Sequence, residues 1–220
     1  MRIVYGYLIS YVYIIVLLVV ITVGMRFSKA ERNDAFRKTV HIMVGFTWIP
    51  LCEFLYGTWH FTIVPLSFVL VTALSVKFNL LKVVERDTPV GRKDFGIVHY
   101  AISMTLICLL ATLYPVYLIP CGIGVFALSF GDGFAAVFGQ AFRGINRNIT
   151  KTKTVIGAIA CFVFTIIGML ILARFTPFSF TVIPLLLIGV VATVMEVIGG
   201  RFDNYTVPVG TIATAILIRI

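Results

Sequence analysis

Three carboxylates, Asp132, Glu196 and Asp203, lie inside or at the ends of apolar segments of the chain. A charged side chain near the centre of a bilayer costs at least about 2.5–3.5 kcal/mol on insertion scales, so carboxylates in such segments are functional candidates. Asp132 interrupts the apolar run 116–142 between two glycines. This placement favours a carboxylate that binds an ion or takes part in a reaction. The alternative is a packed, hydrogen-bonded interruption of a helix.

Small residues surround this carboxylate. Gly131 and Gly133 remove side-chain bulk, which lets backbone and a phosphate group approach each other closely. Asp132, Ala136 and Gly139 have the spacing i, i+4, i+7 and therefore share one face of a helix. That face leaves room for a ligand or for a neighbouring helix. A stripe of small residues is also a common packing device between membrane helices.

The elements that must position these groups are membrane helices. Hydrophobic residues make up 60% of the 220 residues and charged residues 12%, a composition typical of integral membrane proteins. We predict an all-α polytopic membrane protein with about eight (seven to eight) transmembrane helices in a single integral membrane domain, residues 1–220. The expected spans are Ile3–Met25, Val40–Tyr56, Phe61–Phe78, Phe95–Tyr114, Val116–Phe142, Thr154–Phe175, Phe180–Ile198 and Tyr205–Ile218.

The net charge of +9 follows the loops between these spans. Fifteen of the 18 basic residues lie in alternate loops, and only Arg2, Arg174 and Arg219 lie on the other side. By the positive-inside rule the basic loops are cytoplasmic, and both termini lie on the non-cytoplasmic side. No basic patch lies on a separate folded module, so no nucleic-acid partner is expected.

This topology brings cations and carboxylates from three parts of the chain to the cytoplasmic face. They are Arg37, Lys38 and His41 in the second span, Asp132 with the following loop that carries Lys151 and Lys153, and Glu196, Asp203 and Asn204 near the last turn.

Such a mixture suits a polyanion held through a divalent ion. Mg²⁺ is normally held by one or two carboxylates together with phosphate oxygens of a nucleotide. Asp132 and Asp203 would supply the carboxylates, with Asn204 as a neutral oxygen ligand. Basic side chains of the loops would offset charge on the transferred phosphoryl group.

Arg37 and His41 have the spacing i, i+4 and share a helix face. His41 would orient a phosphate or act as a general base, and the alternative is a hydrogen-bonded histidine at the membrane interface. An acceptor hydroxyl needs a proton acceptor, for which Asp132 and His41 are both candidates.

Several short motifs resemble one family, the membrane lipid-alcohol kinases that include dolichol kinase, phytol kinase and CTP-dependent diacylglycerol kinase. The motifs are Arg37-Lys38-x-x-His41, Arg92-Lys93-Asp94-Phe95-Gly96, Gly131-Asp132-x-x-Ala135-x-x-x-Gly139, Lys153-Thr154-x-x-Gly157, and Glu196 followed by Asp203-Asn204-x-x-Val207-Pro208. They occur in order over most of the chain. One position departs from the pattern, because Ile156 stands where the family often has an acidic residue.

The resemblance implies transfer of the γ-phosphoryl group of CTP (or UTP), with Mg²⁺, to a lipid alcohol such as a polyprenol, dolichol, phytol, geranylgeraniol or diacylglycerol. It makes Asp132 the essential carboxylate and Gly139 a position of close approach. It assigns Arg37, Lys38 and Lys153 to the nucleotide and phosphates, and Asp203 with Asn204 to the rest of the polar site. The expected location is the plasma membrane of a prokaryote, or the endoplasmic reticulum or plastid membrane of a eukaryote.

Three other functions stay open at this point. A nucleotidyltransferase similar to the phosphatidate cytidylyltransferases would use the same nucleotide. A small ion-coupled transporter would place Asp132 and Glu196 along an ion path, since transporter sites lie at interrupted helices near the midplane. The outer halves of the predicted spans carry almost no charge, which disfavours such a path. The third is a scaffold without catalytic activity.

Overall fold

The computed structural model describes residues 1–27, 34–78 and 95–220. The segment Arg92-Lys93-Asp94 of the family-like motifs lies outside these residues. The chain divides into two compact units, Met1–Leu113 (unit 1) and Tyr114–Ile220 (unit 2). The described part is built from helices, with one isolated β-bridge between Asn148 and Thr154. The all-α class is therefore confirmed, and the single domain 1–220 stays a prediction.

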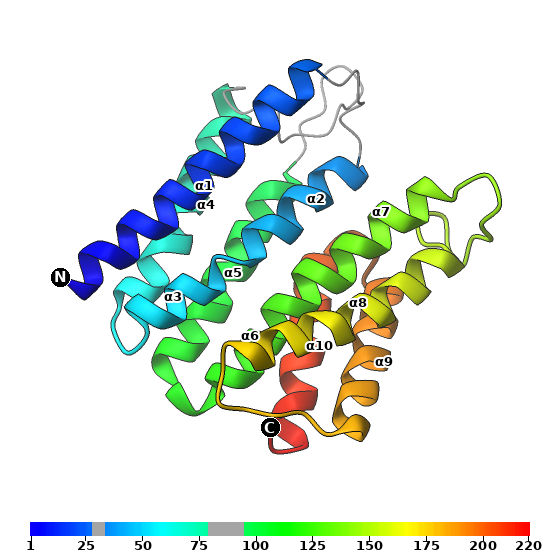
Figure 1. Ribbon diagram of the computed structural model, residues 1–220. Helices are drawn as coiled ribbons and strands as arrows, with labels where there is room; N and C mark the ends of the chain where they lie inside the picture. Colours follow the sequence, from blue (N-terminus) through cyan, green and yellow to red (C-terminus); the bar gives the residue numbers. More distant parts are fainter. Residues whose placement is uncertain (28–33, 79–94) are drawn as a thin grey trace. The chain divides into compact units, whose positions relative to one another are not determined.

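The described residues of unit 1 form five helices (Figure 1). They are α1 (Arg2–Phe27), α2 (Asp34–Gly45), α3 (Trp48–Leu55), α4 (His60–Phe78) and α5 (Gly96–Leu113). Helix α4 packs mainly against α5, and α1 packs against α3 and α4. Polar pairs join α1 to α4: the Tyr7 hydroxyl lies 2.7 Å from His60 Nδ1, and the Tyr11 hydroxyl lies 2.8 Å from Ser67 Oγ.

The second expected span, Val40–Tyr56, is interrupted in the middle. Tight turns, with Phe46 N donating to Met43 O and Thr47 N to Val44 O, separate α2 from α3. Pro50 explains the break, because it has no N–H to donate to the carbonyl of Phe46 and its ring crowds that carbonyl.

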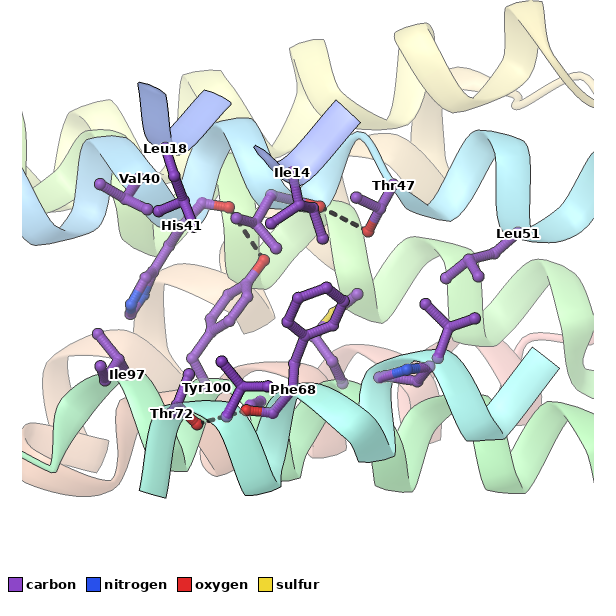
Figure 2. A pocket seen from close by; sticks show the side chains of 16 residues that line it. Ile14, Leu18, Val40, His41, Thr47, Leu51, Phe68, Thr72, Ile97 and Tyr100 are labelled. Carbon is purple, nitrogen blue, oxygen red and sulfur yellow. Dashed lines mark hydrogen bonds between the residues drawn. The ribbon is translucent and has the colours of Figure 1, made fainter. Parts of the chain in front are cut away.

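Helices α1 to α5 each contribute to the lining of an apolar cavity of about 100 Å³ (Figure 2). His41 and Ile97 lie at one end of it, Phe68 lies in the middle and Leu51 lies towards the other end. All of its lining residues belong to unit 1.

Unit 2 contains one long interrupted rod and three further helices (Figure 1). The elements are η2 (Pro115–Tyr117), α6 (Leu118–Phe126), the π-helical turn η3 (Ala127–Asp132), α7 (Gly133–Ala141), α8 (Val155–Arg174), α9 (Val182–Gly199), η4 (Gly200–Phe202) and α10 (Asp203–Leu217). Helix α8 lies along α7 and η3 on one side and packs against α9, which in turn packs against α10. Gly200, with φ +56°, makes the sharp turn between α9 and α10.

Six helical stretches of the described residues are long and apolar enough to cross a membrane. They are Arg2–Ile21, His60–Phe78, Gly96–Leu113, Pro115–Ala141, Val155–Arg174 and Val182–Leu217. The structure thus supports a polytopic membrane protein but not eight spans. The difference arises because α2 and α3 are both short, and because the last stretch contains both α9 and α10.

Candidate functional site

Asp132 lies at the last residue of the π-helical turn η3, where the rod of unit 2 changes from α6 to α7. Its side chain is buried, with 1% of the residue exposed. A single π-turn inside an α-helix alters the direction of the side chains that follow, and such turns are frequent at functional sites. The sequence predicted an interruption at Asp132, and the structure shows it as a wider turn rather than a break.

Lys153 reaches this carboxylate from the loop that precedes α8. The loop folds back on itself: Ile149 N and Thr150 N both donate to Lys153 O, and Val155 N donates to Arg147 O. The Thr150 hydroxyl accepts from Lys153 N at 3.1 Å. These bonds fix the backbone of Lys153, and its side chain extends towards the carboxylates.

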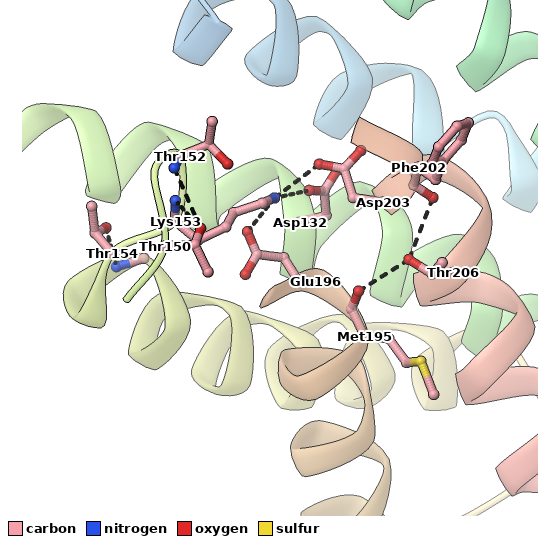
Figure 3. Close-up of polar contacts among 11 residues, drawn as sticks. Asp132, Thr150, Thr152, Lys153, Thr154, Met195, Glu196, Phe202, Asp203 and Thr206 are labelled. Carbon is pink, nitrogen blue, oxygen red and sulfur yellow. Dashed lines mark hydrogen bonds and ion pairs between the residues drawn. The ribbon is translucent and has the colours of Figure 1, made fainter. Parts of the chain in front are cut away.

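The ammonium group of Lys153 lies among three carboxylates (Figure 3). Its Nζ atom is 2.6 Å from Glu196 Oε1, 2.9 Å from Asp203 Oδ2 and 3.9 Å from Asp132 Oδ1. Glu196 comes from the end of α9 and Asp203 from the start of α10, so the turn at Gly200 places both beside η3. We call these four residues the carboxylate–lysine cluster.

The carboxylates of the cluster determine the charge state of Lys153. Burial alone would lower the pKa of Lys153, but the attraction of Asp132, Asp203 and Glu196 outweighs it and raises this pKa above its ordinary value. Lys153 is therefore charged at neutral pH.

The donor atoms of the cluster fit Mg²⁺, which prefers carboxylate and amide oxygens. Glu196 Oε2 and Asn204 Oδ1 are buried and accept no hydrogen bond within the described part of the chain. No set of three or more His, Cys, Asp and Glu side chains in that part is arranged to hold a metal ion by itself.

Gly131 and the stripe residue Gly139 pack against α8 and the residue before it. A Cβ atom at Gly131 would overlap the Thr165 hydroxyl, and one at Gly139 would lie 2.9 Å from Thr154 Oγ1. In this structure both glycines therefore permit close helix packing, which was the alternative interpretation of the stripe. Their role in phosphate binding stays a prediction.

The other predicted cations are distributed as follows. Lys151 is exposed on the loop before α8, whereas Arg37 and Lys38 are buried in unit 1. The guanidinium group of Arg37 lies against Gly96 at the start of α5, where a Cβ atom would overlap it. The absence of a side chain at Gly96 thus makes room for Arg37.

His41 is buried and stacks on Tyr100, with ring centroids 4.1 Å apart. The Tyr100 hydroxyl donates to the backbone carbonyl of His41 at 2.9 Å. Tyr100 fixes both the ring and the backbone of His41, a role that sequence reasoning missed. Only its apolar context was visible in the sequence, because a contact over 59 positions has no local signal.

Sequence reasoning also missed Asn146. Its side-chain oxygen accepts from Ile156 N at 3.0 Å and its amide group donates to Gly139 O at 3.5 Å. Asn146 therefore ties the loop of Lys153 to both α7 and α8. Polar loop residues are common, so its type alone gave no signal.

Comparison with known proteins gives one informative match. The chain is 27% identical over 191 residues to a phytol kinase of Synechocystis sp., which covers 81% of this chain and 76% of that protein. No protein-family model and no solved structure matches the chain. The match confirms the resemblance to the lipid-alcohol kinases that the short motifs predicted.

Proposed function

We propose that this relative of the lipid-alcohol kinases transfers the γ-phosphoryl group of a nucleoside triphosphate, CTP or else UTP, to the hydroxyl group of a membrane lipid alcohol. The similarity to a phytol kinase supports a kinase that acts on a lipid alcohol. The observation that carries the proposal is the carboxylate–lysine cluster, in which three carboxylates surround one ammonium group and supply oxygens that suit a metal–nucleotide complex.

In this proposal the residues of the cluster have different tasks. Asp132 and Asp203, with Asn204 as a neutral ligand, hold Mg²⁺, which when bound offsets the charge of the phosphates. The ammonium group of Lys153, which contacts the same carboxylates, then pairs with a phosphate oxygen instead and stabilises charge on the transferred group. Glu196, the nearest carboxylate to Lys153, orients its ammonium group.

The transfer itself forms a bond between the lipid oxygen and the γ-phosphorus and breaks the bond from that phosphorus to the β–γ bridging oxygen. The nucleoside diphosphate leaves, and the hydroxyl proton passes to a base, for which Asp132 and His41 are the two candidates. On the resemblance alone, Arg37, Lys38 and Lys151 are proposed to bind phosphate, with Gly131 and Gly139 at positions of close approach.

The reaction is proposed to occur at the cytoplasmic face. If α2–α3 and α10 also lie in the membrane, eight segments result and both termini lie on the non-cytoplasmic side, as the basic loops indicate. The membrane is then the plasma membrane in a prokaryote, or the endoplasmic reticulum or plastid membrane in a eukaryote.

The proposal is tested with purified protein, Mg²⁺, and CTP, UTP or ATP labelled in turn at the γ- and α-phosphate. A panel of polyprenol, phytol, geranylgeraniol and diacylglycerol serves as acceptor. We expect label from the γ-position in a lipid monophosphate. Label from the α-position would instead show a nucleotidyltransferase, and no labelled lipid from any pair would contradict the kinase.

A further inference from the structure

The first three backbone N–H groups of α8 all donate to the loop that carries Lys153. Val155 N donates to Arg147 O at 2.9 Å, Ile156 N to Asn146 Oδ1 at 3.0 Å and Gly157 N to Thr154 Oγ1 at 3.2 Å. The N–H groups of a first helical turn have no partner within the helix, and in many proteins they bind water or an anion instead. Here the loop occupies them, so these donors are not available to a phosphate group.

Asn146 is bonded at both ends of its side-chain amide. Its oxygen accepts from Ile156 N in the first turn of α8, and its nitrogen donates at 3.5 Å to Gly139 O in the last turn of α7. The start of a helix has N–H groups without an acceptor and the end has carbonyl groups without a donor. A single amide has both functions, so Asn146 caps the end of α7 and the start of α8 together.

The two groups that Asn146 joins lie where α7 and α8 approach each other closely. A Cβ atom at Gly139 would lie 3.6 Å from Gly157 Cα and 2.9 Å from Thr154 Oγ1. Thr154 directly follows Lys153, and α7 directly follows the turn η3 that carries Asp132. Asn146 therefore links the loop of Lys153 to the same rod that supplies Asp132.

Between Asn146 and α8, bonds within the loop hold the backbone of Lys153. Its N–H donates to the Thr150 hydroxyl at 3.1 Å, and its carbonyl accepts from Ile149 N and Thr150 N. With the backbone held in this way, the position of the Lys153 ammonium group depends on how the whole loop sits against α7. Charge-assisted hydrogen bonds are short, and a shift of the loop by about 1 Å would lengthen them beyond the hydrogen-bonding range.

We propose that Asn146 is a positioning residue that acts through Lys153. Its amide holds the loop at the distance from α7 at which the Lys153 ammonium group reaches Glu196 and Asp203, 2.6 and 2.9 Å away (Figure 3). The inference rests on the proposed function for its effect on phosphoryl transfer. The positioning itself rests on the two hydrogen bonds of Asn146, and all residues concerned belong to unit 2.

Two substitutions separate the two bonds. Asn146→Ala removes both of them. Asn146→Asp keeps an acceptor for Ile156 N and loses the donor to Gly139 O. Asn148→Ala is the matched control, since Asn148 is exposed on the same loop. Thermal unfolding in detergent shows whether each variant is folded.

The first measurement needs no enzymatic activity. Lys153→Met is introduced into the wild-type, Asn146→Ala and Asn148→Ala proteins, and the decrease in unfolding temperature is compared. If Asn146 positions the ammonium group, Lys153 contributes less without it, and the decrease in the Asn146→Ala protein should be at most about half of that in wild type. The Asn148→Ala protein should show the full decrease. Additive effects of Asn146→Ala and Lys153→Met would overturn the proposal, because Asn146 would then only cap the two helices.

The second measurement is phosphoryl transfer at a temperature at which all variants are folded. Asn146→Ala should lower kcat by about 10- to 100-fold, the usual effect of a misplaced group. It should leave the KM for the triphosphate nearly unchanged, because Lys153 is proposed to act on the transferred group. Asn146→Asp should have an intermediate kcat, and Asn148→Ala should match wild type.

The two measurements distinguish this inference from the proposed function. Equal kcat in the folded Asn146→Ala and Asn148→Ala proteins would overturn the role of Asn146 while the kinase stands. Coupling of Asn146 and Lys153 in thermal unfolding, without phosphorylation of any alcohol by wild type, would support the positioning of Lys153 and refute the kinase.

Discussion

Lys153 is the residue on which the electrostatics of unit 2 depend. Its ammonium group is within 4 Å of three carboxylates, and its side chain is 12% exposed. Removing one partner of a buried ion pair leaves uncompensated charge and typically costs about 3–5 kcal/mol. Here the loss of one cation would leave three carboxylates together.

Lys153→Met should therefore lower the unfolding temperature relative to wild type. Lys153→Arg should lower it much less, because the positive charge remains. The raised pKa of Lys153 determines how this difference depends on pH. Its stabilisation is complete below the pKa of an unfolded lysine, about 10.4, and is lost only as pH rises through the higher folded value. The difference between wild type and Lys153→Met should thus be constant from pH 6 to 9.

Thermal unfolding in detergent at several pH values measures this difference. Lys151→Met is the control, since Lys151 is exposed on the same loop and should have little effect on stability. A difference that shrinks between pH 6 and pH 9 would show that Lys153 titrates in this range and that the carboxylates do not hold its charge.

The carboxylates of the site could be predicted from the sequence, because burial of a charge in an apolar segment is costly wherever it occurs. Asp132, Glu196 and Asp203 were singled out in this way, whereas Lys153 was identified from its basic loop and from the family-like motif. Their distances could not be predicted, because these depend on how η3, α8, α9 and α10 pack. The support of His41 by Tyr100 was missed for the same reason.

At the scale of elements, α7 and α8 approach closely where small residues face each other. A Cβ atom at Gly157 would lie 2.9 Å from the backbone oxygen of Ala135 and 2.9 Å from Thr154 Oγ1. A backbone atom cannot move away as a flexible side chain can. Gly157 therefore sets the distance between the two helices, and with it the approach of the Lys153 loop to η3.

Gly157→Ala should destabilise the protein by about 1–3 kcal/mol, the usual cost of overpacking. Because the loop of Lys153 leads directly into α8, lipid phosphorylation should fall as well. Thermal unfolding and the phosphorylation assay measure the two effects. Gly144→Ala is the matched control, since no atom lies within 4 Å of its added Cβ. Equal stability of the two variants would refute the close packing.

Helices could be predicted from long apolar segments, and their interruptions only in part. The glycines beside Asp132 indicated an irregular turn, yet a π-turn needs one more residue per turn and has no clear sequence signal. Pro50 was visible in the sequence, but an apolar segment around it masked the break between α2 and α3. The stripe Asp132, Ala136, Gly139 left ligand and helix packing open; the structure shows close packing at Gly139, and the role of this glycine in phosphate binding stays a prediction.

At the scale of the whole molecule, the alternation of basic loops predicts the direction of every segment. Both termini should lie on the non-cytoplasmic side and the loop between α7 and α8 on the cytoplasmic side. Gly144, in open space on that loop, is suited to a cysteine label. In sealed vesicles, Gly144→Cys should react with an impermeant thiol reagent from the cytoplasmic side, and terminal tags should be cleaved by protease from the other.

The four native cysteines are buried or half-buried, so the cysteine-labelling experiment starts from a low background. Tags and label that are accessible from the same side would contradict this topology.

The class of membrane protein could be predicted from the composition, since 60% hydrophobic residues leave too few polar side chains for a water-exposed surface. The number of membrane-spanning segments could not be predicted in the same way, because a short apolar helix such as α10 has the same composition within a membrane as within a protein core.

The most direct test of the account is lipid phosphorylation by the Asp132→Asn variant. Removal of one carboxylate charge from the cluster should reduce the rate by about 100-fold or more, as loss of a group that stabilises the transition state does. Glu53→Gln, which neutralises an exposed carboxylate of α3, is the control and should retain full activity. Transfer of γ-phosphate to a prenyl alcohol by wild type and Glu53→Gln, and its loss in a folded Asp132→Asn protein, is the predicted result. Undiminished transfer by Asp132→Asn would contradict it.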